Sequence, residues 1–290
     1  MTYIISVINL KGGVGKTTTT VAMAEILAGE FDKRVLVIDL DPQTNSTTML
    51  IGEQAWKDAN SAGHTLEALF KDSLRRDGDA AQFDLEKTLH REASPISAVR
   101  TLDLLPSSLD LIDVQDDLAA VRGGRYHTDR PVDVLHKATS TLATEYDYVL
   151  IDCPPNLGII TLNGIRMSHG YVIPTKPDIL STYGIPQIMN RVAGFAETLD
   201  HRVVPLGTII NMYRLGTNIH ENTIRALNRN VEEGKVPKLF RAFIPYGSRV
   251  EEAAEFASVS TLRQRWGPAS LFGQLKDLTV ELTERAESQL

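Results

Sequence analysis

The sequence predicts a single α/β domain with the P-loop nucleoside triphosphatase fold, in which helices cover both faces of a mostly parallel, twisted sheet. Short apolar runs rich in β-branched residues alternate with segments whose apolar residues recur at helical spacing. The first run leads directly into a glycine-rich loop and then a helical segment. These observations predict about seven or eight strands. Residues 1–290 are expected to form one domain, with a variable insertion at 52–100 and a C-terminal helix docked on the core at 268–290.

The first strand, loop and helix are predicted over 3–8, 9–18 and 19–29. In this order, glycines let backbone N–H groups turn toward an anion, and the helix N-terminus adds its partial positive charge. Lys16 is then placed to reach the β- and γ-phosphates of a nucleotide, and the Thr17 hydroxyl to bind Mg²⁺. The alternative, a glycine-rich turn that binds nothing, does not account for the agreement of strand, loop, Lys-Thr pair and helix.

The loop departs from the general Gly-x-x-x-x-Gly-Lys-Thr/Ser template at its first position, because Asn9 and Leu10 lead into Lys11-Gly12-Gly13 where the template has its first glycine. The departure places a second lysine, Lys11, at the entry of the loop. Contacts to the nucleotide are expected from Lys11, Gly12, Gly13, Val14, Gly15, Lys16, Thr17 and Thr18.

Two further predicted strands end in carboxylates. The strand over 34–39 ends with Asp39 and is followed by Asp41, and the strand over 146–152 ends with Asp152. Because ligands collect at the carboxyl ends of parallel strands, these groups are expected to face the loop. Asp152 has the form of a Walker B carboxylate, so Thr17, Asp39 and Asp152 are the predicted Mg²⁺ residues. A carboxylate there can also orient an attacking water; alternatively, Asp39 or Asp41 merely caps the following segment.

The base of the nucleotide is predicted to be adenine. The Thr-Lys-Pro-Asp tetrapeptide at 175–178 resembles a guanine-reading motif, but it follows the first strand after Asp152 rather than the second. That second strand ends in Asn211, whose amide can hydrogen-bond an adenine edge. A last core strand over 239–244 leads into Pro245 and Tyr246, which are expected beside the same base.

The remaining elements follow from the same periodicities. Strands are predicted over 102–106, 171–174 and 204–210, and helices over 65–70, 109–122, 132–144, 159–167, 181–199, 217–233 and 270–290. A solvated loop is predicted over 75–79. The polar face of the last helix is largely acidic, which favours docking on the core over lying on a membrane.

Composition limits the class of protein. Of 290 residues, 42% are hydrophobic and 23% charged, as in ordinary soluble proteins. The net charge of −7 means that nucleic-acid contact requires a local basic patch, and 202–249 supplies one, with eight basic and three acidic residues. The single cysteine, Cys153, excludes a disulfide or a multi-cysteine metal site within one chain. No signal peptide or stretch of about 20 apolar residues is seen, so the cytoplasm is the expected compartment.

Taken together, the motifs resemble those of the ParA/MinD family of deviant Walker A ATPases, and most of all the small ParA partition proteins. The similarity covers nearly the whole chain except about 52–100, which, like the tetrapeptide at 175–178, is not standard for the family. It is carried by Lys-Gly-Gly-Val-Gly-Lys-Thr-Thr at 11–18, Asp-Leu-Asp-Pro-Gln at 39–43 with Asn45, Asp-Cys-Pro-Pro at 152–155, the segment 157–163, and Ile-Pro at 244–245.

The resemblance implies an ATP-dependent cycle. Lys11 would reach across a two-fold interface to the ATP phosphates of the partner subunit, so that a homodimer forms only with ATP. Thr17 would ligate Mg²⁺, Asp152 would hold the ion through water, and Asp41 would orient the hydrolytic water. The implied catalytic residues are Lys11, Lys16 and Asp41, and the implied adenine contacts are Asn211 and Pro245.

The same resemblance implies partners and a cellular location. The ATP dimer would bind double-stranded DNA without sequence preference through Arg249, with Arg225, Arg229, Arg214 and Lys238 as weaker candidates. A ParB-like protein or cargo adaptor, often acting through a basic N-terminal peptide, would stimulate slow hydrolysis. The protein would then work at the nucleoid. Because the chain begins at its first strand, no N-terminal operator-binding domain is expected.

Two other functions compete. A MinD-like membrane-cycling ATPase is disfavoured by the acidic C-terminal helix. A redox relative such as the nitrogenase iron protein needs cluster cysteines from each subunit, which Cys153 alone does not supply.

Overall fold

The computed structural model describes residues 1–75, 80–120, 130–267 and 269–290. Over these ranges, six strands form one parallel sheet in the order β3-β2-β4-β1-β5-β6. The strands are β1 (Tyr3–Val7), β2 (Val35–Asp39), β3 (Leu102–Leu105), β4 (Tyr148–Asp152), β5 (Gly170–Thr175) and β6 (Val204–Ile210). The predicted α/β class with a parallel sheet is confirmed, whereas the predicted count of seven or eight strands is too high.

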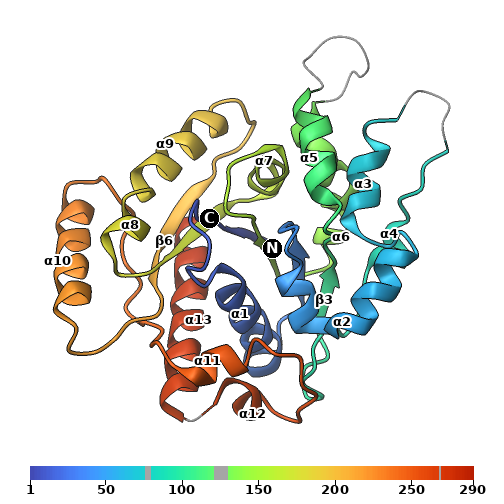
Figure 1. Cartoon of the computed structure of the whole chain (residues 1–290). Helices are drawn as coiled ribbons and strands as arrows, with labels where there is room; N and C mark the ends of the chain where they lie inside the picture. The colour runs from blue at the N-terminus through green and yellow to red at the C-terminus, as the bar shows by residue number, and fades with distance from the viewer. Residues whose placement is uncertain (76–79, 121–129, 268) are drawn as a thin grey trace.

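Helices lie on both faces of this sheet (Figure 1). On one face α1 and α13 pack together with α2, α11 and α12, and on the other face lie α3, α5, α6, α7 and α9. The helices are α1 (Lys16–Phe31), α2 (Asn45–Ser61), α3 (Leu66–Asp72), α4 (Leu85–Thr88), α5 (Leu111–Ala120), a 3₁₀ turn η1 (Pro131–Asp133), α6 (Val134–Ala143), α7 (Ile159–Met167), α8 (Ile179–Thr182), α9 (Ile185–Ala196), α10 (Asn218–Glu232), α11 (Ser248–Glu252), α12 (Leu262–Trp266) and α13 (Ala269–Gln289).

The central strands are buried on both faces, which explains their near-continuous apolar sequences. In β1, Ile5 and Val7 belong to the cluster shared with α1 and α13, whereas Ile4 belongs to the cluster shared with α6 and α7. In α13, an apolar stripe is buried in the first of these clusters: Leu271, Phe272, Leu275, Leu278 and Leu282. Among the described residues, no helix is long and apolar enough to span a membrane.

The predicted last strand, over 239–244, is wrong. This segment runs beside β6 and makes only an isolated bridge between Thr208 and Leu239. The physical reason is the buried Arg285 side chain of α13, which donates hydrogen bonds to the carbonyl oxygens of Leu206 (2.6 Å), Lys238 (3.1 Å) and Leu239 (2.7 Å). The carbonyls of Leu206 and Leu239 are therefore satisfied by this side chain, whereas that of Lys238 also accepts the Thr208 N–H, and pairing with β6 stays discontinuous.

Two of the predicted helices differ from the structure, and a helix that was not predicted follows β2. The segment 181–199 is split into α8 and α9, because Gly184 and Pro186 end one helix and start the next. The unpredicted helix α2 runs from Asn45 to Ser61, with a kink at Gly52, whose φ is 81°. The helix predicted over 109–122 begins at Leu111, and its last two residues, like most of the loop predicted over 75–79, lie outside the described ranges.

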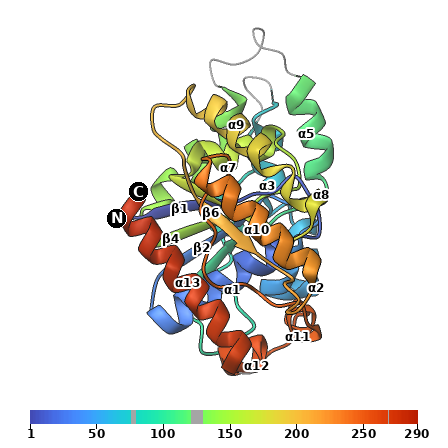
Figure 2. The same ribbon diagram turned by 90° about the vertical axis from the view of Figure 1, so that its left-hand side faces the viewer.

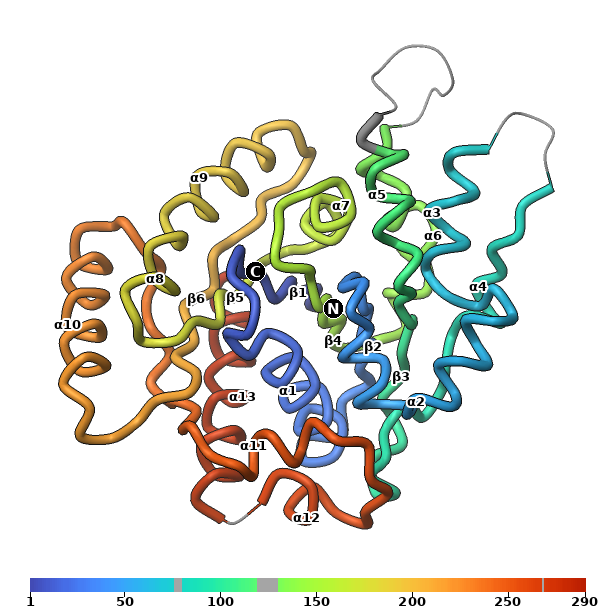
Figure 3. The backbone as a smooth tube through the Cα atoms, in the orientation of Figure 1, coloured from blue at the N-terminus to red at the C-terminus, as the bar shows by residue number. Residues whose placement is uncertain are grey.

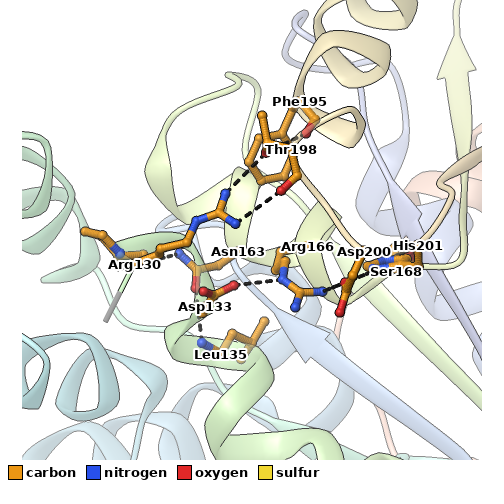
Figure 4. Close-up of polar contacts among 11 residues, drawn as sticks. Arg130, Asp133, Leu135, Asn163, Arg166, Ser168, Phe195, Thr198, Asp200 and His201 are labelled. Carbon is orange, nitrogen blue, oxygen red and sulfur yellow. Dashed lines mark hydrogen bonds and ion pairs between the residues drawn. The ribbon is translucent and has the colours of Figure 1, made fainter. Parts of the chain in front are cut away.

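The two chain termini lie side by side at the amino edge of the sheet (Figure 2). A polar network fixes the same edge, shown in Figure 4. Arg166 of α7 donates a hydrogen bond to Asp133 (2.7 Å), and Arg130 donates to the carbonyl and hydroxyl oxygens of Thr198 (both 3.2 Å). These contacts tie η1, α7 and the turn after α9 together at the edge opposite the carboxyl ends of the strands.

Candidate functional site

The predicted site residues meet at the carboxyl edge of the sheet, where the loop after β1 lies between the ends of β4 and β5 (Figure 3). Strand pairing sets this arrangement, because Val7 of β1 is level with Asp152 of β4 and Asp152 is level with Asp39 of β2. The loop and both carboxylates predicted at neighbouring strand ends are thus brought together.

The loop adopts a conformation that suits glycine. Gly15 has φ = 86°, and a Cβ atom at this position would lie 2.5 Å from the Asn211 amide nitrogen. Asn9, which stands just before the first template position, is buried and anchors the loop: its amide donates to the carbonyl of Pro174 (2.7 Å), and its oxygen accepts from the N–H of Lys11 (3.0 Å). Asn9 therefore fixes the entry of the loop, where Lys11 lies.

The two loop lysines occupy different environments. Lys16 is buried at the start of α1, with its Nζ atom 3.5 Å from the carbonyl oxygen of Lys11. Lys11 has a side chain that is 41% exposed, and its Nζ atom lies 3.6 Å from Asp178 Oδ1. Lys16 thus faces the anion site of its own loop, whereas the Lys11 side chain lies at the surface.

Asp39 is held by the start of α2. Its Oδ2 atom accepts hydrogen bonds from the Thr47 N–H (2.9 Å) and hydroxyl (2.7 Å), and its Oδ1 atom accepts from the Asp41 N–H (3.1 Å). Burial and the neighbouring Asp152 carboxylate raise the pKa of Asp39 well above its usual value. Since both oxygens have protein donors, the geometry favours Asp39 as an anchor for the following loop over a direct metal ligand.

Asp152 carries an oxygen suited to a metal-bound water. Its Oδ2 atom accepts a hydrogen bond from the Ser46 hydroxyl (2.7 Å), while its buried Oδ1 atom has no partner. Burial raises the pKa of Asp152 to about 6, although the Ser46 hydrogen bond and the nearby Thr17 hydroxyl act in the opposite direction. An unsatisfied buried acceptor beside Thr17 fits the second coordination sphere of Mg²⁺ bound to a nucleotide.

Asp41 is also buried at this edge, and its Oδ1 atom accepts from the Gln43 N–H (3.0 Å). Burial raises the pKa of this carboxyl, and the Lys16 ammonium opposes the rise. Within the described ranges, no group of three His, Cys, Asp or Glu side chains is arranged to hold a metal by itself. A Mg²⁺ ion here would therefore depend on hydroxyl, phosphate and water oxygens as well.

The side-chain amide of Asn211 uses its nitrogen in hydrogen bonds within the protein, whereas its oxygen has no partner. Its Nδ2 atom donates to the carbonyl of Val14 (2.9 Å) and to the hydroxyl of Thr19 (2.9 Å), which fixes the carboxamide orientation. Its Oδ1 atom is buried without a partner. A free acceptor matches the exocyclic amino group of adenine and opposes the carbonyl that guanine has at the same position.

A narrow pocket of about 30 Å³ adjoins this amide, and Pro245 and Tyr246 are among its lining residues. The Arg214 guanidinium lies 4.0 Å from the centre of the Tyr246 ring. The half-exposed Tyr246 would have to move for a base to enter. Asp178 of the guanine-like tetrapeptide instead caps α8, accepting from the N–H (2.7 Å) and hydroxyl (2.8 Å) of Ser181.

The five residues predicted to contact DNA come from different elements of the fold. Arg249 of α11 donates to Glu252 (2.8 Å) and to the carbonyl of Gln264 (2.6 Å). Arg214 lies beside Tyr246, which precedes Arg249 by three residues. Arg225 and Arg229 belong to α10. Lys238 lies near Glu281 and Glu284 of α13. Their assignment to DNA stays a prediction.

Sequence reasoning missed the contacts that position the site: Ser46 and Thr47 bond the carboxylates, Asn9 anchors the loop, and Asp178 pairs with Lys11. The signal for the first two was their place in the first turn of the helix after β2, because hydroxyl side chains there face the neighbouring strand ends. The pairing of Asp178 with Lys11 joins segments far apart in sequence, and no local pattern indicates it.

Comparison with known proteins gives the same assignment. The AAA_31 family model, described as an AAA domain, matches residues 2–204. The chain is 31% identical over 253 residues to the sporulation initiation inhibitor protein Soj of Bacillus subtilis, an alignment that covers 87% of this chain and 88% of Soj. It is 28% identical over 253 residues to the chromosome partitioning protein ParA of Myxococcus xanthus, covering 87% of this chain and 78% of that protein.

Solved structures share the fold. Apo McdA of Cyanothece superposes with a TM-score of 0.76 at 21% identity, covering 97% of this chain and all of McdA. Cobyrinic acid a,c-diamide synthase of Mycobacterium smegmatis, with an ATP analogue and magnesium bound, gives a TM-score of 0.73 at 23% identity, covering 100% of this chain and 98% of that chain. With its phosphate loop, paired lysines and Walker B carboxylate in place, the chain belongs to the ParA/MinD family of deviant Walker A ATPases.

Proposed function

We propose that this protein is a partition ATPase that dimerises with ATP, binds double-stranded DNA without sequence preference as the dimer, and moves a plasmid, a chromosome region or another large cargo. Hydrolysis of ATP to ADP and phosphate, stimulated by a ParB-like or cargo-adaptor protein, would release the dimer. The protein would act in the cytoplasm at the nucleoid. Membership of the ParA/MinD family and the chemistry of the nucleotide site support the proposal.

The position of Lys11 is the observation that carries this proposal. Lys11 is surface-exposed beside a phosphate loop that already has its own buried lysine, Lys16. An exposed ion pair such as Lys11–Asp178 contributes less than about 1 kcal/mol, so Lys11 can exchange it for a stronger partner at little cost. The triphosphate of a second subunit is such a partner, and the contact weakens when the γ-phosphate leaves.

The surface around the site suits a second copy of the chain. Exposed apolar side chains lie beyond the strand ends on both sides of the loop, with Leu109 and Ile112 at α5 and Leu180 on α8. Apolar groups exposed around a charged centre are typical of an interaction surface. In a two-fold dimer each copy would present the same surface, so Lys11 of each subunit would face the other's nucleotide.

The residues present fit ATP and Mg²⁺. Thr17 would hold the ion directly and Asp152 would hold it through water, using the oxygen that lacks a protein partner. Bound Mg²⁺ would neutralise charge on the phosphates. Lys16 would bind the phosphates, Asp41 would orient the attacking water, and the free Asn211 oxygen would accept a hydrogen bond from adenine. Structures of the similar proteins with ATP or with an ATP analogue and magnesium support this choice.

DNA binding is the part of the proposal that depends most on the family. The chain is acidic overall, so contact with DNA must come from local basic residues. The first candidates are Arg249 and Arg214, of which Arg214 lies beside Tyr246. The apolar stripe of α13 is buried in the core, so no observation here favours a MinD-like membrane function.

The test combines nucleotide binding, light scattering and DNA shift assays. With a non-hydrolysable ATP analogue and Mg²⁺, the parent should dimerise and shift DNA in a salt-dependent manner, whereas with ADP it should do neither. Lys11→Ala should bind ATP yet stay monomeric, and Lys16→Ala should lose ATP binding. Arg249→Glu should dimerise but bind DNA weakly. A monomeric parent under these conditions, or a Lys11→Ala variant that dimerises normally, would contradict the proposal.

A further inference from the structure

A buried ion pair lies on the face of the sheet that carries α1, α2 and α12 (Figure 1). Arg265 of α12 and Glu25 of α1 have side chains that are 3% and 0% exposed, and Arg265 Nε lies 3.3 Å from Glu25 Oε2. Glu25 also accepts hydrogen bonds from the Trp266 indole N–H (2.7 Å) and from the Ser94 hydroxyl (2.8 Å). Glu25 is thus fixed in place and anchors the guanidinium of Arg265 inside the core.

The directional hydrogen bond of Arg265 goes to α2. Its Nη2 atom donates to the carbonyl oxygen of Met49 (2.9 Å), whereas its Nε and Nη1 atoms have no hydrogen-bond partner among the described residues. Burial raises the pKa of Glu25 and lowers the pKa of Arg265, so both charges are held against a desolvation penalty. An apolar pair of similar volume would fill the same space without this penalty. What such a pair would lack is the donor to Met49.

Met49 lies just before a break in α2. Gly52 has φ = 81° and ψ = 161°, so residues 45–51 form a first half of the helix that ends at this break. Such dihedral angles interrupt the ladder of hydrogen bonds from each N–H to the carbonyl four residues earlier, and the last carbonyls of the first half need donors from outside the helix. Arg265 supplies one of these donors. A Cβ atom at Gly52 would lie 2.9 Å from the Phe256 ring, so the segment before α12 also packs on the break.

The first half of α2 holds the carboxylates at two strand ends. The Ser46 hydroxyl donates to Asp152 (2.7 Å), and Thr47 donates to Asp39 through its N–H (2.9 Å) and its hydroxyl (2.7 Å). Seven helical residues make only about two turns, so the two ends of this half move together. Met49 follows Ser46 by about one turn, and a shift of the Met49 carbonyl would therefore displace the hydroxyl that holds Asp152.

The short helix α12 presents Arg265 from a fixed backbone. Thr261 and Gln264 cap this helix through a reciprocal pair of hydrogen bonds. Just before the cap, the backbone of Val259 pairs with the carbonyl of Pro95 (3.0 Å) and with the N–H of Ser97 (2.9 Å). The donor to α2 is therefore held both by its ion-pair partner and by the segment that carries it.

We propose that Arg265 is a positioning residue for the Mg²⁺ site: by capping the first half of α2, it keeps Ser46 in place to hold Asp152. The role toward Mg²⁺ rests on the proposed function, whereas the anchoring of α2 does not. Arg265 acts through α2 alone and is not a catalytic residue.

The test replaces the ion pair with a neutral pair, Glu25→Gln combined with Arg265→Met, because removal of the arginine alone would leave a buried charge unpaired. The matched control is Glu281→Gln combined with Arg285→Met, which makes the same change at the buried pair of α13, whose hydrogen-bond partners lie outside α2. Arg265→Lys is a second variant that keeps the charge beside Glu25 but loses the planar fork.

Binding of a fluorescent, non-hydrolysable ATP analogue is then titrated against Mg²⁺. The neutral pair and Arg265→Lys should each raise the Mg²⁺ concentration at half-saturation about fivefold, less than the tenfold expected for a direct partner of the metal-holding carboxylate. Binding of the analogue without Mg²⁺ should stay unchanged, which also reports that the variants are folded. The control pair should change neither quantity.

A double-mutant cycle with Ser46→Ala tests the route. If Arg265 acts through Ser46, adding the neutral pair to Ser46→Ala should weaken Mg²⁺ binding by less than about twofold more, whereas independent effects would multiply to about fiftyfold. Amide hydrogen exchange over residues 45–51 of the nucleotide-free protein supplies a readout that needs no ligand. Exchange should become about fivefold faster in the neutral-pair variant and stay unchanged in the control.

Three outcomes overturn the proposal: an unchanged Mg²⁺ half-saturation in the folded variants, equal weakening in the neutral-pair and control variants, or independent effects in the cycle with Ser46→Ala. Equal loss of analogue binding with and without Mg²⁺ would also overturn it, because it would show a general structural role. If the parent shows no Mg²⁺-dependent binding while exchange over 45–51 still becomes faster in the neutral-pair variant, the proposed function is contradicted and the anchoring of α2 by Arg265 stands.

Discussion

Replacing Asp152 with Asn should stabilise the nucleotide-free protein while weakening its Mg²⁺-dependent ATP binding. The carboxylate is fully buried, and its Oδ1 atom lacks any hydrogen-bond partner. An amide has no charge to desolvate, and the hydroxyls of Ser46 and Thr17 can rotate to suit it. The substitution therefore removes the free-energy cost of burying an ionised carboxylate, a cost that only bound Mg²⁺ and ATP offset.

The magnitude follows from the pKa of Asp152, which burial raises from 3.8 to about 6. Because the folded state holds this proton more tightly than the unfolded state, stability falls as pH rises from about 4 to about 6. The cost of ionising the buried group is about 1 kcal/mol at pH 4.5 and about 3 kcal/mol at pH 7.5. Asp152→Asn should recover these amounts, so its advantage should grow with pH.

Urea unfolding of the parent and of Asp152→Asn at pH 4.5 and 7.5, without nucleotide, measures this difference. Asp116→Asn, the same chemical change on the exposed side of α5, is the control and should alter stability by less than about 0.5 kcal/mol. A fluorescent ATP analogue titrated with and without Mg²⁺ supplies the second readout. An advantage that is equal at both pH values, or absent, would refute the reasoning that burial of this carboxylate is costly.

Three more substitutions test other contacts. Ser46→Ala should weaken Mg²⁺-dependent binding of the ATP analogue about tenfold, because it removes the hydrogen bond that holds Asp152. Thr48→Ala, on the same helical turn, is the control and should not weaken it. Equal effects of the two substitutions in a Mg²⁺ titration would contradict the role of Ser46. Asp178→Asn retains a helix cap but frees Lys11 from its ion pair. Sedimentation should then show the ATP dimer forming at up to about fivefold lower concentration. A weaker dimer would contradict the proposal that Lys11 exchanges Asp178 for the phosphates of the second subunit. Arg285→Met removes the donor to Glu281 Oε1 and to the carbonyls of Leu206 and Leu239, while Glu281 Oε2 keeps the Arg241 N–H. Urea unfolding should show a loss of about 2–4 kcal/mol, and a loss below about 1 kcal/mol would show that these groups find other partners.

Features governed by local pattern were predictable from the sequence. The helix over Ile159–Met167 and the strand over Val204–Ile210 have the predicted bounds, because caps and apolar periodicity are both encoded within a few residues. The phosphate loop and the strand-end carboxylates were also predictable, since parallel strands force their carboxyl ends to one edge.

The errors arise where a distant side chain competes with the local pattern. Residues 239–244 have the composition of a strand, yet Arg285, some 40 residues later, occupies carbonyl oxygens beside them. Likewise, nothing near Lys11 in the sequence indicates that Asp178 pairs with it. Such contacts form only in the completed fold, so they cannot be predicted from short stretches of sequence.

The exposed Lys11–Asp178 pair sets a limit on how a regulating partner can act on the dimer. If a partner altered only this pair, the coupling could not exceed the contribution of the pair, about 1 kcal/mol, or about fivefold in dimer affinity. By reciprocity, ATP-driven dimerisation would change the affinity for that partner by the same factor. Regulation stronger than fivefold therefore requires that the partner also shift the loop against the phosphates, which the buried Asn9 anchor opposes.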